Sequence, residues 1–199
     1  MLKKLIFIFF LTFIITTSFL GQGEGNNWYF GNYAGLNFST NPPTILNDGR
    51  LTTSEGCSSV SGKDGILAFY TDGRYVWDLN HNVMANGNGD LMGHSSSTQS
   101  AVICPKPNTY NYTTKRYDNY DIITIDEYNG TNGVRYSEVD MTLNGGLGDV
   151  VLTNKNTPLY GNGVISIECA NVAKHSNGCD FWIIGKEVGT NNFNVYLVT

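Results

Sequence analysis

The chain has 199 residues, enough for one large domain, and a formal net charge of −5 at pH 7. Charged residues make up only 15% of it, and its scattered Lys and Arg residues exclude the concentrated basic surface of a nucleic-acid-binding protein. No window repeats apolar residues at helical spacing, so long helices are excluded as well. A composition rich in Gly, Tyr and uncharged polar residues favours a secreted β protein.

The first 21 residues form a separate segment. Lys3 and Lys4 precede the apolar run Leu5–Ile15, and small residues follow it. This order is typical of a secretory signal peptide, so we expect Sec export and a protein that is secreted or displayed at the cell surface. The alternative is a membrane anchor, because Leu5–Leu20 is only slightly shorter than the ~20 residues that span a bilayer. Removing residues 1–21 takes away both lysines and changes the formal charge to −7. No membrane span is expected in the remaining chain.

Short strands and tight turns begin directly after this segment. Trp28–Phe30 and Ala34–Phe38 read as two strands around a Gly-Asn turn, and Asn47–Gly49 marks another turn.

The clearest hairpin in the sequence is Gly65–Asp78. Two runs of aromatic and β-branched residues, Ile66–Thr71 and Arg74–Asp78, flank the dipeptide Asp72-Gly73. This pattern predicts a two-residue turn in which both central residues have positive φ.

This hairpin belongs to the first of three similar units. Each unit has a short strand, a turn, a strongly apolar strand, a second turn and an aromatic strand of alternating polarity. The predicted strands are Ser58–Ser61, Leu67–Asp72 and Tyr75–Asp78; then Ala101–Cys104, Asp121–Asp126 and Tyr136–Asp140; then Asn171–Lys174, Asp180–Gly185 and Phe193–Val198.

Multi-strand units spaced by about 40–60 residues are typical of β-propeller blades, which bury their faces by stacking around an axis. We therefore expect an all-β fold for residues 22–199, a partial β-propeller of about three blades. The alternative is a β-sandwich, in which similar hairpins recur without radial symmetry. Three blades do not close a ring, and the sequence stops inside an apolar strand at Thr199. We therefore expect this chain to be the N-terminal piece of a longer protein.

Several of these segments resemble one protein family. They are NNWYFGNYAGLNF at Asn26–Phe38, LTTSEGCSSVS at Leu51–Ser61, LAFYTDGRYVWDLNHNVMANG at Leu67–Gly87, GHSSSTQSAVICPKP at Gly93–Pro107, RYSEVDMTLNGGLGDV at Arg135–Val150 and AKHSNGCDFWII at Ala173–Ile184. In this order they resemble the N-terminal propeller-like region of large, gliding-motility-associated surface proteins. Gliding bacteria export these proteins through the type IX secretion system.

The resemblance implies export across both membranes and display on, or release from, the cell surface. Two features depart from the family. Tyr112–Asn119 stands where the family runs directly into the next strand, and the family's C-terminal sorting domain is absent from this sequence. No catalytic residue of the family is carried over to this chain.

Four cysteines follow the predicted signal peptide: Cys57, Cys104, Cys169 and Cys179. Export permits disulfides, and three pairings are possible. Cys169 and Cys179 are close in sequence, on either side of an expected turn, and are the favoured pair. The alternative is that some of the four are buried free thiols. None of the spacings is that of a zinc site.

Histidines and serines provide the next candidates. His81, His94 and His175 lie in or near predicted turns. If loops of neighbouring blades meet on one face, these residues and nearby carboxylates would share a metal or acid–base site. The simpler interpretation is that each histidine binds the backbone of its own turn. Gly93–Ser97 lacks the G-x-S-x-G pattern of a nucleophile elbow, so a polar loop is expected there.

Asn- and Gly-rich runs and acids at strand ends are further candidate sites. Asn86–Asp90 spaces oxygen ligands as calcium loops do, but it lacks the downstream bidentate acid, which favours a Gly/Asn turn. Gly145–Gly148 lacks the strand–loop–helix context of a phosphate site, and we expect a flexible connection between blades. Acidic residues at strand ends would cap turns or, if paired, cleave a glycosidic bond: these are Glu55, Asp72, Asp78, Asp126 and Asp140.

Aromatic residues that alternate along strands are expected to pack between blades, although exposed ones would stack on sugar rings. They are Trp28, Tyr29, Tyr70, Tyr75, Trp77, Tyr136, Trp182 and Tyr196. We therefore predict a non-enzymatic extracellular module for binding, adhesion or structure, with no catalytic, cofactor or metal residue assigned. Its expected partners are a surface glycan or protein and other domains of the same longer chain, not nucleic acid. The alternative is a secreted hydrolase acting on polysaccharide or peptide with a propeller scaffold.

Overall fold

The computed structural model describes residues 23–128, 130–159 and 166–199, and the predicted signal peptide lies outside them. The described residues are all-β, with 47% in strands and 5% in helices, which confirms the all-β part of the predicted fold. The helical residues in the described ranges form the 3₁₀ turns η1 (Gly23–Gly25), η2 (Asn144–Gly146) and η3 (Leu152–Asn154). No helix among the described residues is long and apolar enough to cross a membrane.

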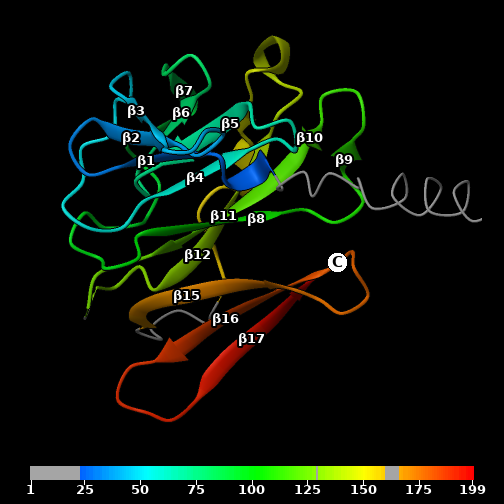
Figure 1. The fold of residues 1–199 in the computed structure, drawn as a ribbon. Helices are drawn as coiled ribbons and strands as arrows, with labels where there is room; N and C mark the ends of the chain where they lie inside the picture. The colour runs from blue at the N-terminus through cyan, green and yellow to red at the C-terminus, as the bar shows by residue number, and fades with distance from the viewer. Residues whose placement is uncertain (1–22, 129, 160–165) are drawn as a thin grey trace, which may run out of the picture.

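Four antiparallel sheets, each built from its own stretch of chain, follow one another along the sequence (Figure 1). The first sheet contains β1 (Asn27–Phe30), β2 (Ala34–Asn37) and β3 (Thr44–Leu46). The second contains β4 (Ser58–Ser61), β5 (Leu67–Thr71), β6 (Tyr75–Asp78) and β7 (Val83–Asn88). The third contains β8 (Ala101–Pro105), β11 (Asn119–Ile125), β12 (Val134–Asp140) and β13 (Asp149–Val150), with β14 (Thr157–Pro158) also paired to β12. The fourth contains β15 (Ser166–Lys174), β16 (Phe181–Glu187) and β17 (Phe193–Val198).

Every strand of the three predicted units is present, and the strands of each unit pair in chain order. Several strands were not predicted: β3 in the first sheet, β7 in the second, and β13 and β14 in the third. A separate hairpin, β9 (Tyr110–Asn111) and β10 (Arg116–Tyr117), inserted between β8 and β11, was not predicted either. None of the sheets closes on itself.

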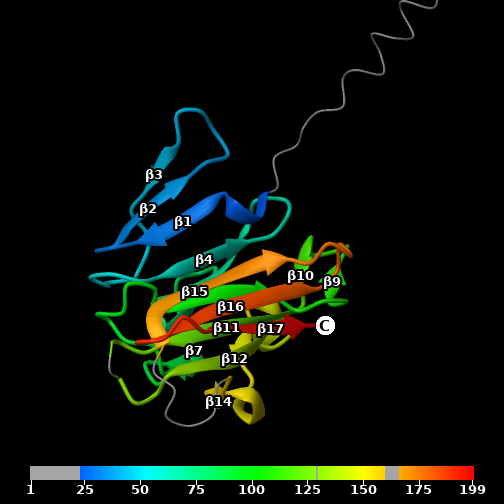
Figure 2. The same cartoon turned by 90° about the horizontal axis from the view of Figure 1, so that it is seen from below.

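Three apolar cores join the four sheets into one stack, seen from two sides in Figures 1 and 2. In the first core, Tyr29 of the first sheet packs with Tyr70 of the second. In the second core, Phe69 of the second sheet packs with Ile122 of the third. In the third core, residues of β11 and β12 in the third sheet meet Ala170, Ile183 and their neighbours in the fourth.

Strand β11 explains how the middle of this stack is built. Tyr120 and Ile122 belong to the core shared with the second sheet, whereas Ile123 and Ile125 belong to the core shared with the fourth. All four side chains are at most 1% exposed. Because successive side chains of a strand point to opposite faces, an apolar residue at nearly every position is required when both faces are covered.

The predicted turn at Asp72-Gly73 is wrong in its type. Gly73 has a φ of 85°, but Asp72 is not among the residues with positive φ, and three residues separate β5 from β6. The Oδ1 atom of Asp72 accepts hydrogen bonds from the backbone N–H groups of Arg74 (2.8 Å) and Tyr75 (2.7 Å). The acidic side chain therefore replaces part of the hydrogen bonding that a two-residue turn would supply.

Two glycine-containing runs also differ from expectation. Asn86–Asn88, expected in a turn, forms the end of β7, and Gly87 lies so close to the second core that a Cβ atom there would be 2.9 Å from Val76. Gly145–Gly148 was expected to connect blades, but it joins β12 to β13 within the third sheet. Gly145, Gly146 and Gly148 all have positive φ there.

The predicted Cys169–Cys179 disulfide is wrong, because all four cysteines are free. Cys169 is separated from the far end of β15 at Lys174 by about 16 Å of extended chain. Cys179 lies beyond that end, whereas disulfide Cα atoms are at most about 7 Å apart. The other two cysteines match the alternative of free thiols at least partly buried. Burial raises the pKa of Cys104 to about 12, with a further contribution from Asp121.

Asp121 is a buried carboxyl group in the third sheet. It lies between Cys104 of β8 and Glu138 of β12, and it is only 7% exposed. Glu138 accepts hydrogen bonds from Asn119 (3.0 Å) and Asn154 (2.7 Å) and pairs with Lys106 at 3.0 Å. Among the described residues, Oδ1 of Asp121 has no hydrogen-bond partner. Burial raises the pKa of Asp121 to about 6; Lys106 opposes this shift and Glu138 adds to it.

Because Phe69 lies in the core between the second and third sheets, shortening its side chain should strongly destabilise the protein. This side chain is fully buried and meets the ring of Tyr120 edge-on at 5.3 Å. Phe69→Ala is expected to lower the free energy of unfolding by about 3–5 kcal/mol, measured by urea denaturation. The matched control is Ile66→Ala, on a side chain that is 62% exposed, with an expected change within about 0.5 kcal/mol. Equal losses for both variants would contradict the stacked core.

Asp121 predicts a pH dependence of stability. Its pKa is raised on folding, so its contribution is fully present below the unfolded pKa of about 4 and is lost as pH rises toward 6. Asp121→Asn removes this loss. Relative to the unmodified chain, the free energy of unfolding of the variant should rise by about 2 kcal/mol between pH 4 and pH 7, since each pKa unit is worth about 1.4 kcal/mol. Urea denaturation at both pH values measures the difference. The same pH dependence of unfolding free energy in both proteins would contradict a raised pKa for Asp121.

Candidate docking surface

The strand-end carboxylates bind their own turns, as the capping interpretation predicts. Besides Asp72, Asp78 accepts hydrogen bonds from the N–H groups of Asn80 and Asn82, and Asp140 accepts from Thr142. Asp126 binds the N–H groups of Glu127 (2.9 Å) and Asn132 (2.8 Å). Glu55 is exposed. Four of the five strand-end acids therefore serve as acceptors for the backbone N–H groups of their own turns.

His81 belongs to the core between the first and second sheets. Its Nε2 atom is 3.3 Å from Asp48, and its Nδ1 atom is 3.1 Å from the hydroxyl group of Tyr70. Tyr29 donates to the same Asp48 carboxylate at 3.0 Å. Burial raises the pKa of Tyr29, and the hydrogen bond to Asp48 adds to the shift. Burial likewise raises the pKa of Tyr70 to about 12. These polar contacts therefore link the first sheet to the second, and both tyrosines that take part are neutral.

His94, Ser96 and Glu127 are the nearest approach to a hydrolase triad. Ser96 Oγ lies 2.9 Å from His94 Nδ1 and donates to Glu127 at 3.0 Å. Glu127 is also 3.4 Å from the same His94 Nδ1. In a catalytic triad the serine and the acid bind opposite nitrogens of the imidazole ring. Here both bind Nδ1, so the histidine is not placed to pass a proton from serine while held by the acid.

His175 begins the turn between β15 and β16. Its Nδ1 atom accepts a hydrogen bond from the Asn177 N–H group at 3.0 Å, and its ring lies 5.2 Å from that of Trp182. The three histidines thus have separate neighbours. The described residues contain no group of three or more His, Cys, Asp or Glu side chains that would hold a metal ion.

Six of the eight aromatic candidates pack between sheets, as their alternation predicts. Tyr29, Tyr70, Trp77 and Tyr75 form a stacked column, with ring centroids 4.6, 5.2 and 5.6 Å apart in that order. Tyr136 and Tyr196 pack against the core between the third and fourth sheets. Trp28 and Trp182 lie instead on outer faces.

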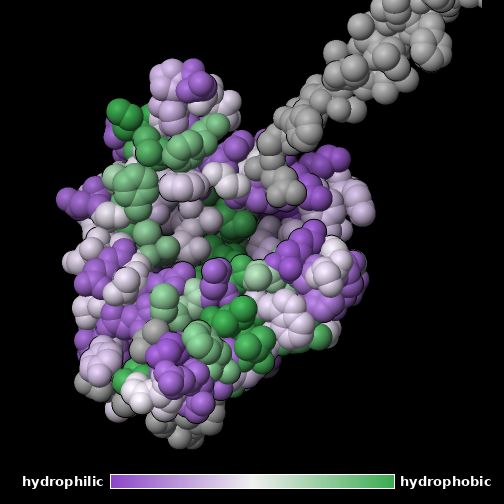
Figure 3. All heavy atoms as spheres, turned by 60° about the horizontal axis from the view of Figure 1, so that its bottom comes forward, coloured by the Kyte–Doolittle hydropathy of each residue, from purple (hydrophilic) through white to green (hydrophobic). Residues whose placement is uncertain are grey.

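The fourth sheet has an outer apolar face whose β17 side chains are exposed, and we call it the open face. It comprises Trp182 and Ile184 of β16 and Phe193, Val195 and Leu197 of β17. The three β17 side chains are 63%, 52% and 45% exposed. Their neighbours Tyr196 and Val198 point the other way, into the third core. Figure 3, which turns this side toward the viewer, shows apolar residues gathered there among hydrophilic ones.

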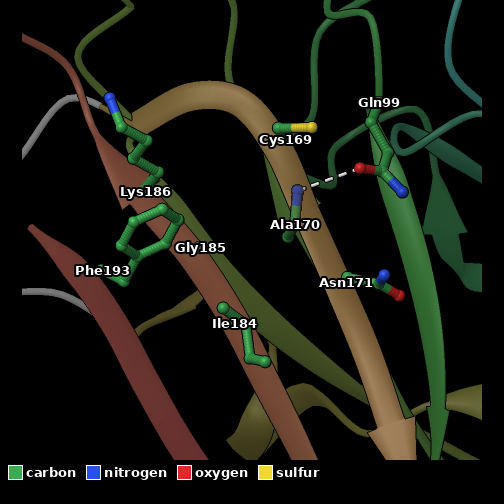
Figure 4. A pocket seen from close by; sticks show the side chains of 8 residues that line it. All are labelled: Gln99, Cys169, Ala170, Asn171, Ile184, Gly185, Lys186 and Phe193. Atoms are coloured by element: carbon green, nitrogen blue, oxygen red, sulfur yellow. Dashed lines mark hydrogen bonds between the residues drawn. The ribbon is translucent and has the colours of Figure 1, made fainter. Parts of the chain in front are cut away.

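A groove of about 340 Å³ lies at one end of the open face (Figure 4). Phe193, Ile184 and Lys186 line it from β16 and β17, and Cys169 and Asn171 line it from β15. Its wall is completed by Gln99, which precedes β8 and accepts a hydrogen bond from the Ala170 N–H group at 2.9 Å.

The same end of the fourth sheet is bound tightly to the third. Glu168 accepts hydrogen bonds from the N–H and hydroxyl groups of Thr98 at 3.0 and 2.9 Å, and from the Tyr128 N–H group at 2.6 Å. The hydrogen bonds from the Thr98 and Tyr128 backbone lower the pKa of Glu168 and keep it ionised. The sheet that carries the open face is therefore anchored to the third sheet by the hydrogen bonds of Glu168.

The opposite end of the stack has a similar surface. Trp28, Leu36 and Ile45 lie side by side across β1, β2 and β3 and point away from the first core. Trp28 is 52% exposed and Ile45 is 74% exposed. The stack thus presents an apolar sheet face at each end.

Sequence reasoning missed the open face, although β17 contains a signal for it. The segment FNVYLV is apolar at every position except Asn194. A strand covered on one face alternates apolar and polar residues, whereas a strand covered on both does not. Reading β17 in this way predicts a second apolar face that needs a covering layer.

No protein-family model, curated protein or solved structure matches this chain. The resemblance to exported surface proteins of gliding bacteria therefore stays a prediction.

Proposed function

We propose that this chain is a non-enzymatic, extracellular structural module of an exported cell-surface protein. Its open face packs against a further antiparallel sheet from another domain of the same longer protein. The observation that carries the proposal is the open face itself, a row of large apolar side chains on the outer side of an anchored sheet. Apolar surface of this kind gains free energy by leaving water, at about 25 cal/mol for each Å² buried.

Continuity with the three inner interfaces supports a β-sheet as the occupant. Each inner interface is formed by alternate side chains of two neighbouring antiparallel sheets. The open face repeats that arrangement, with Ile184 opposite Val195 and Trp182 opposite Leu197 across β16 and β17. Because the open face has the arrangement of one side of these inner interfaces, a second antiparallel sheet fits it best.

We further propose that the stacked sheets are blades of a β-propeller. The first strands of successive sheets lie beside one another: β1 beside β4, β4 beside β8, and β8 beside β15. In a propeller the corresponding strands of neighbouring blades adjoin around the axis. Adding sheets beyond the open face would continue this series. The lysine-led apolar segment at residues 1–21 and the composition support export.

The non-enzymatic role is supported by how the polar candidates are used. The strand-end acids cap turns, His81 sits within a sheet interface, and His94 holds both Ser96 and Glu127 on one ring nitrogen. A hydrolase would need an acid and a base to face a common cleft.

The open face is tested with the double variant Val195→Thr, Leu197→Lys. The purified chain is expected to bind the apolar dye ANS and to self-associate as its concentration rises, because the open face is uncovered. The double variant should lose at least about half of the dye fluorescence and sediment as a monomer. Fluorescence titration and sedimentation velocity measure these outcomes.

Ile66→Lys is the matched control, since it adds a lysine at an exposed apolar site, 62% exposed, in the β4–β5 turn. It should leave dye binding and association unchanged. The proposal fails if the double variant behaves like the unmodified chain. It also fails if that variant loses stability as a core substitution does, because the face would then be covered within the chain.

A further inference from the structure

A second hollow lies where three parts of the stack meet, and we call it the tyrosine pocket. Its volume is about 300 Å³. The β9–β10 hairpin provides Tyr110, Tyr112 and Tyr117, the β4–β5 turn provides Lys63, and the end of β15 with its following turn provides Lys174. Asn108, Gly178 and Cys179 complete the lining. Figure 2 shows the hairpin and the turn after β15 on the same side of the molecule.

The tyrosines are held in place by a chain of ring contacts that runs into the core. The distances between ring centroids are 5.0 Å from Tyr112 to Tyr110, 5.3 Å from Tyr110 to Tyr117 and 5.9 Å from Tyr117 to Tyr120, and each pair meets edge-on. Tyr120 is only 1% exposed, and its hydroxyl group accepts a hydrogen bond from the Tyr117 N–H group at 3.2 Å. Tyr112, at the outer end, is 79% exposed. The pocket therefore presents an accessible aromatic ring on an ordered base.

Backbone and side-chain hydrogen bonds order the hairpin itself. Asn111 Oδ1 accepts from the N–H groups of Thr113 (2.9 Å) and Thr114 (3.2 Å). The N–H group of Lys63 donates to the Lys115 carbonyl at 2.7 Å and ties the hairpin to the β4–β5 turn. A binding site ordered before the ligand arrives loses less entropy on binding.

The charge of the pocket is opposite to that of the chain. Its charged lining residues are Lys63 and Lys174, and no carboxylate lines it among the described residues, although the whole chain carries −5. The Lys63 ammonium group lies 4.4 Å from the centre of the Tyr110 ring, a cation–π contact that holds the charge beside an aromatic surface. Burial, then Glu24, raises the pKa of Tyr117, so its hydroxyl group stays protonated as a donor.

We propose that the tyrosine pocket binds an acidic sugar of an extracellular glycan. The ring of a hexuronate stacks on Tyr112, and its carboxylate pairs with Lys63 and Lys174 through charge-assisted hydrogen bonds. The volume suits one or two sugar units, at the lower end of the range for small-ligand sites. A single nucleic-acid strand is less well matched, because it requires a positive track along its backbone, whereas this pocket has two lysines in an acidic chain.

The experiment compares an oligogalacturonate with its fully methyl-esterified form, which keeps the sugar rings and removes the carboxylate charge. Isothermal titration calorimetry of the purified chain should give binding of the acid form at least about tenfold tighter than binding of the ester. Lys63→Gln with Lys174→Gln should weaken binding of the acid form by about tenfold or more, and Tyr112→Ala by a similar factor.

Matched controls separate the pocket from general surface effects. Tyr33→Ala removes another exposed tyrosine, 52% exposed, and Lys115→Gln removes a lysine of the same hairpin that does not line the pocket. Both should retain affinity within about twofold, a change of about 0.4 kcal/mol.

Equal affinity for acid and ester, equal losses in the control variants, or no measurable binding would overturn the proposal. Tighter binding of a single-stranded oligodeoxythymidylate than of the oligogalacturonate would overturn it as well. The open-face double variant should bind the oligogalacturonate as the unmodified chain does. Failure of the open-face proposal and failure of this one are therefore distinguishable.

Discussion

The double burial of strand β11 is the constraint on which the rest of the structure depends. Tyr120 and Ile122 on one side, and Ile123 and Ile125 on the other, commit the third sheet to neighbours on both faces. β5 does the same for the second sheet, with Phe69 facing the third sheet and Tyr70 facing the first. A single layer with two apolar faces is stable only inside a stack. The two outermost sheets of the stack each carry an apolar outer surface: the open face on the fourth sheet, and Trp28, Leu36 and Ile45 on the first.

Local patterns predicted the parts of this fold that depend on local interactions. Alternation and turn residues located the strands of all three units, and the capping roles of Asp72, Asp78 and Asp140 follow from each side chain's own turn. The failures arose where distant residues decide the outcome. Asn86–Asn88 forms a strand because Gly87 fits closely against Val76 of the neighbouring strand. Cys169 and Cys179 are near in sequence, but the extended β15 keeps them apart.

Neither candidate surface could be located from the sequence alone. Phe193, Val195 and Leu197 have the same residue types as buried strand positions, and only the order of the sheets leaves them uncovered. The tyrosine pocket depends on Lys63, Tyr110 and Lys174, which are far apart along the chain and belong to three different parts of the stack. The repeated tyrosines of the inserted hairpin, YNYTTKRY, were a visible signal, but nothing local indicates that lysines from elsewhere meet them.

Each of the four sheets is built from one stretch of chain, which in the third sheet is interrupted by the β9–β10 hairpin, and this has a consequence for how the molecule assembles. Hairpin pairings close short loops, so a sheet forms from its own stretch of chain at low contact order. The pairings that join sheets involve side chains rather than backbone ladders. The chain can thus fold layer by layer from its N-terminus, with each completed sheet serving as the template on which the next condenses. Adding or removing one whole sheet therefore changes the length of the stack but leaves the strand register inside the other sheets unchanged.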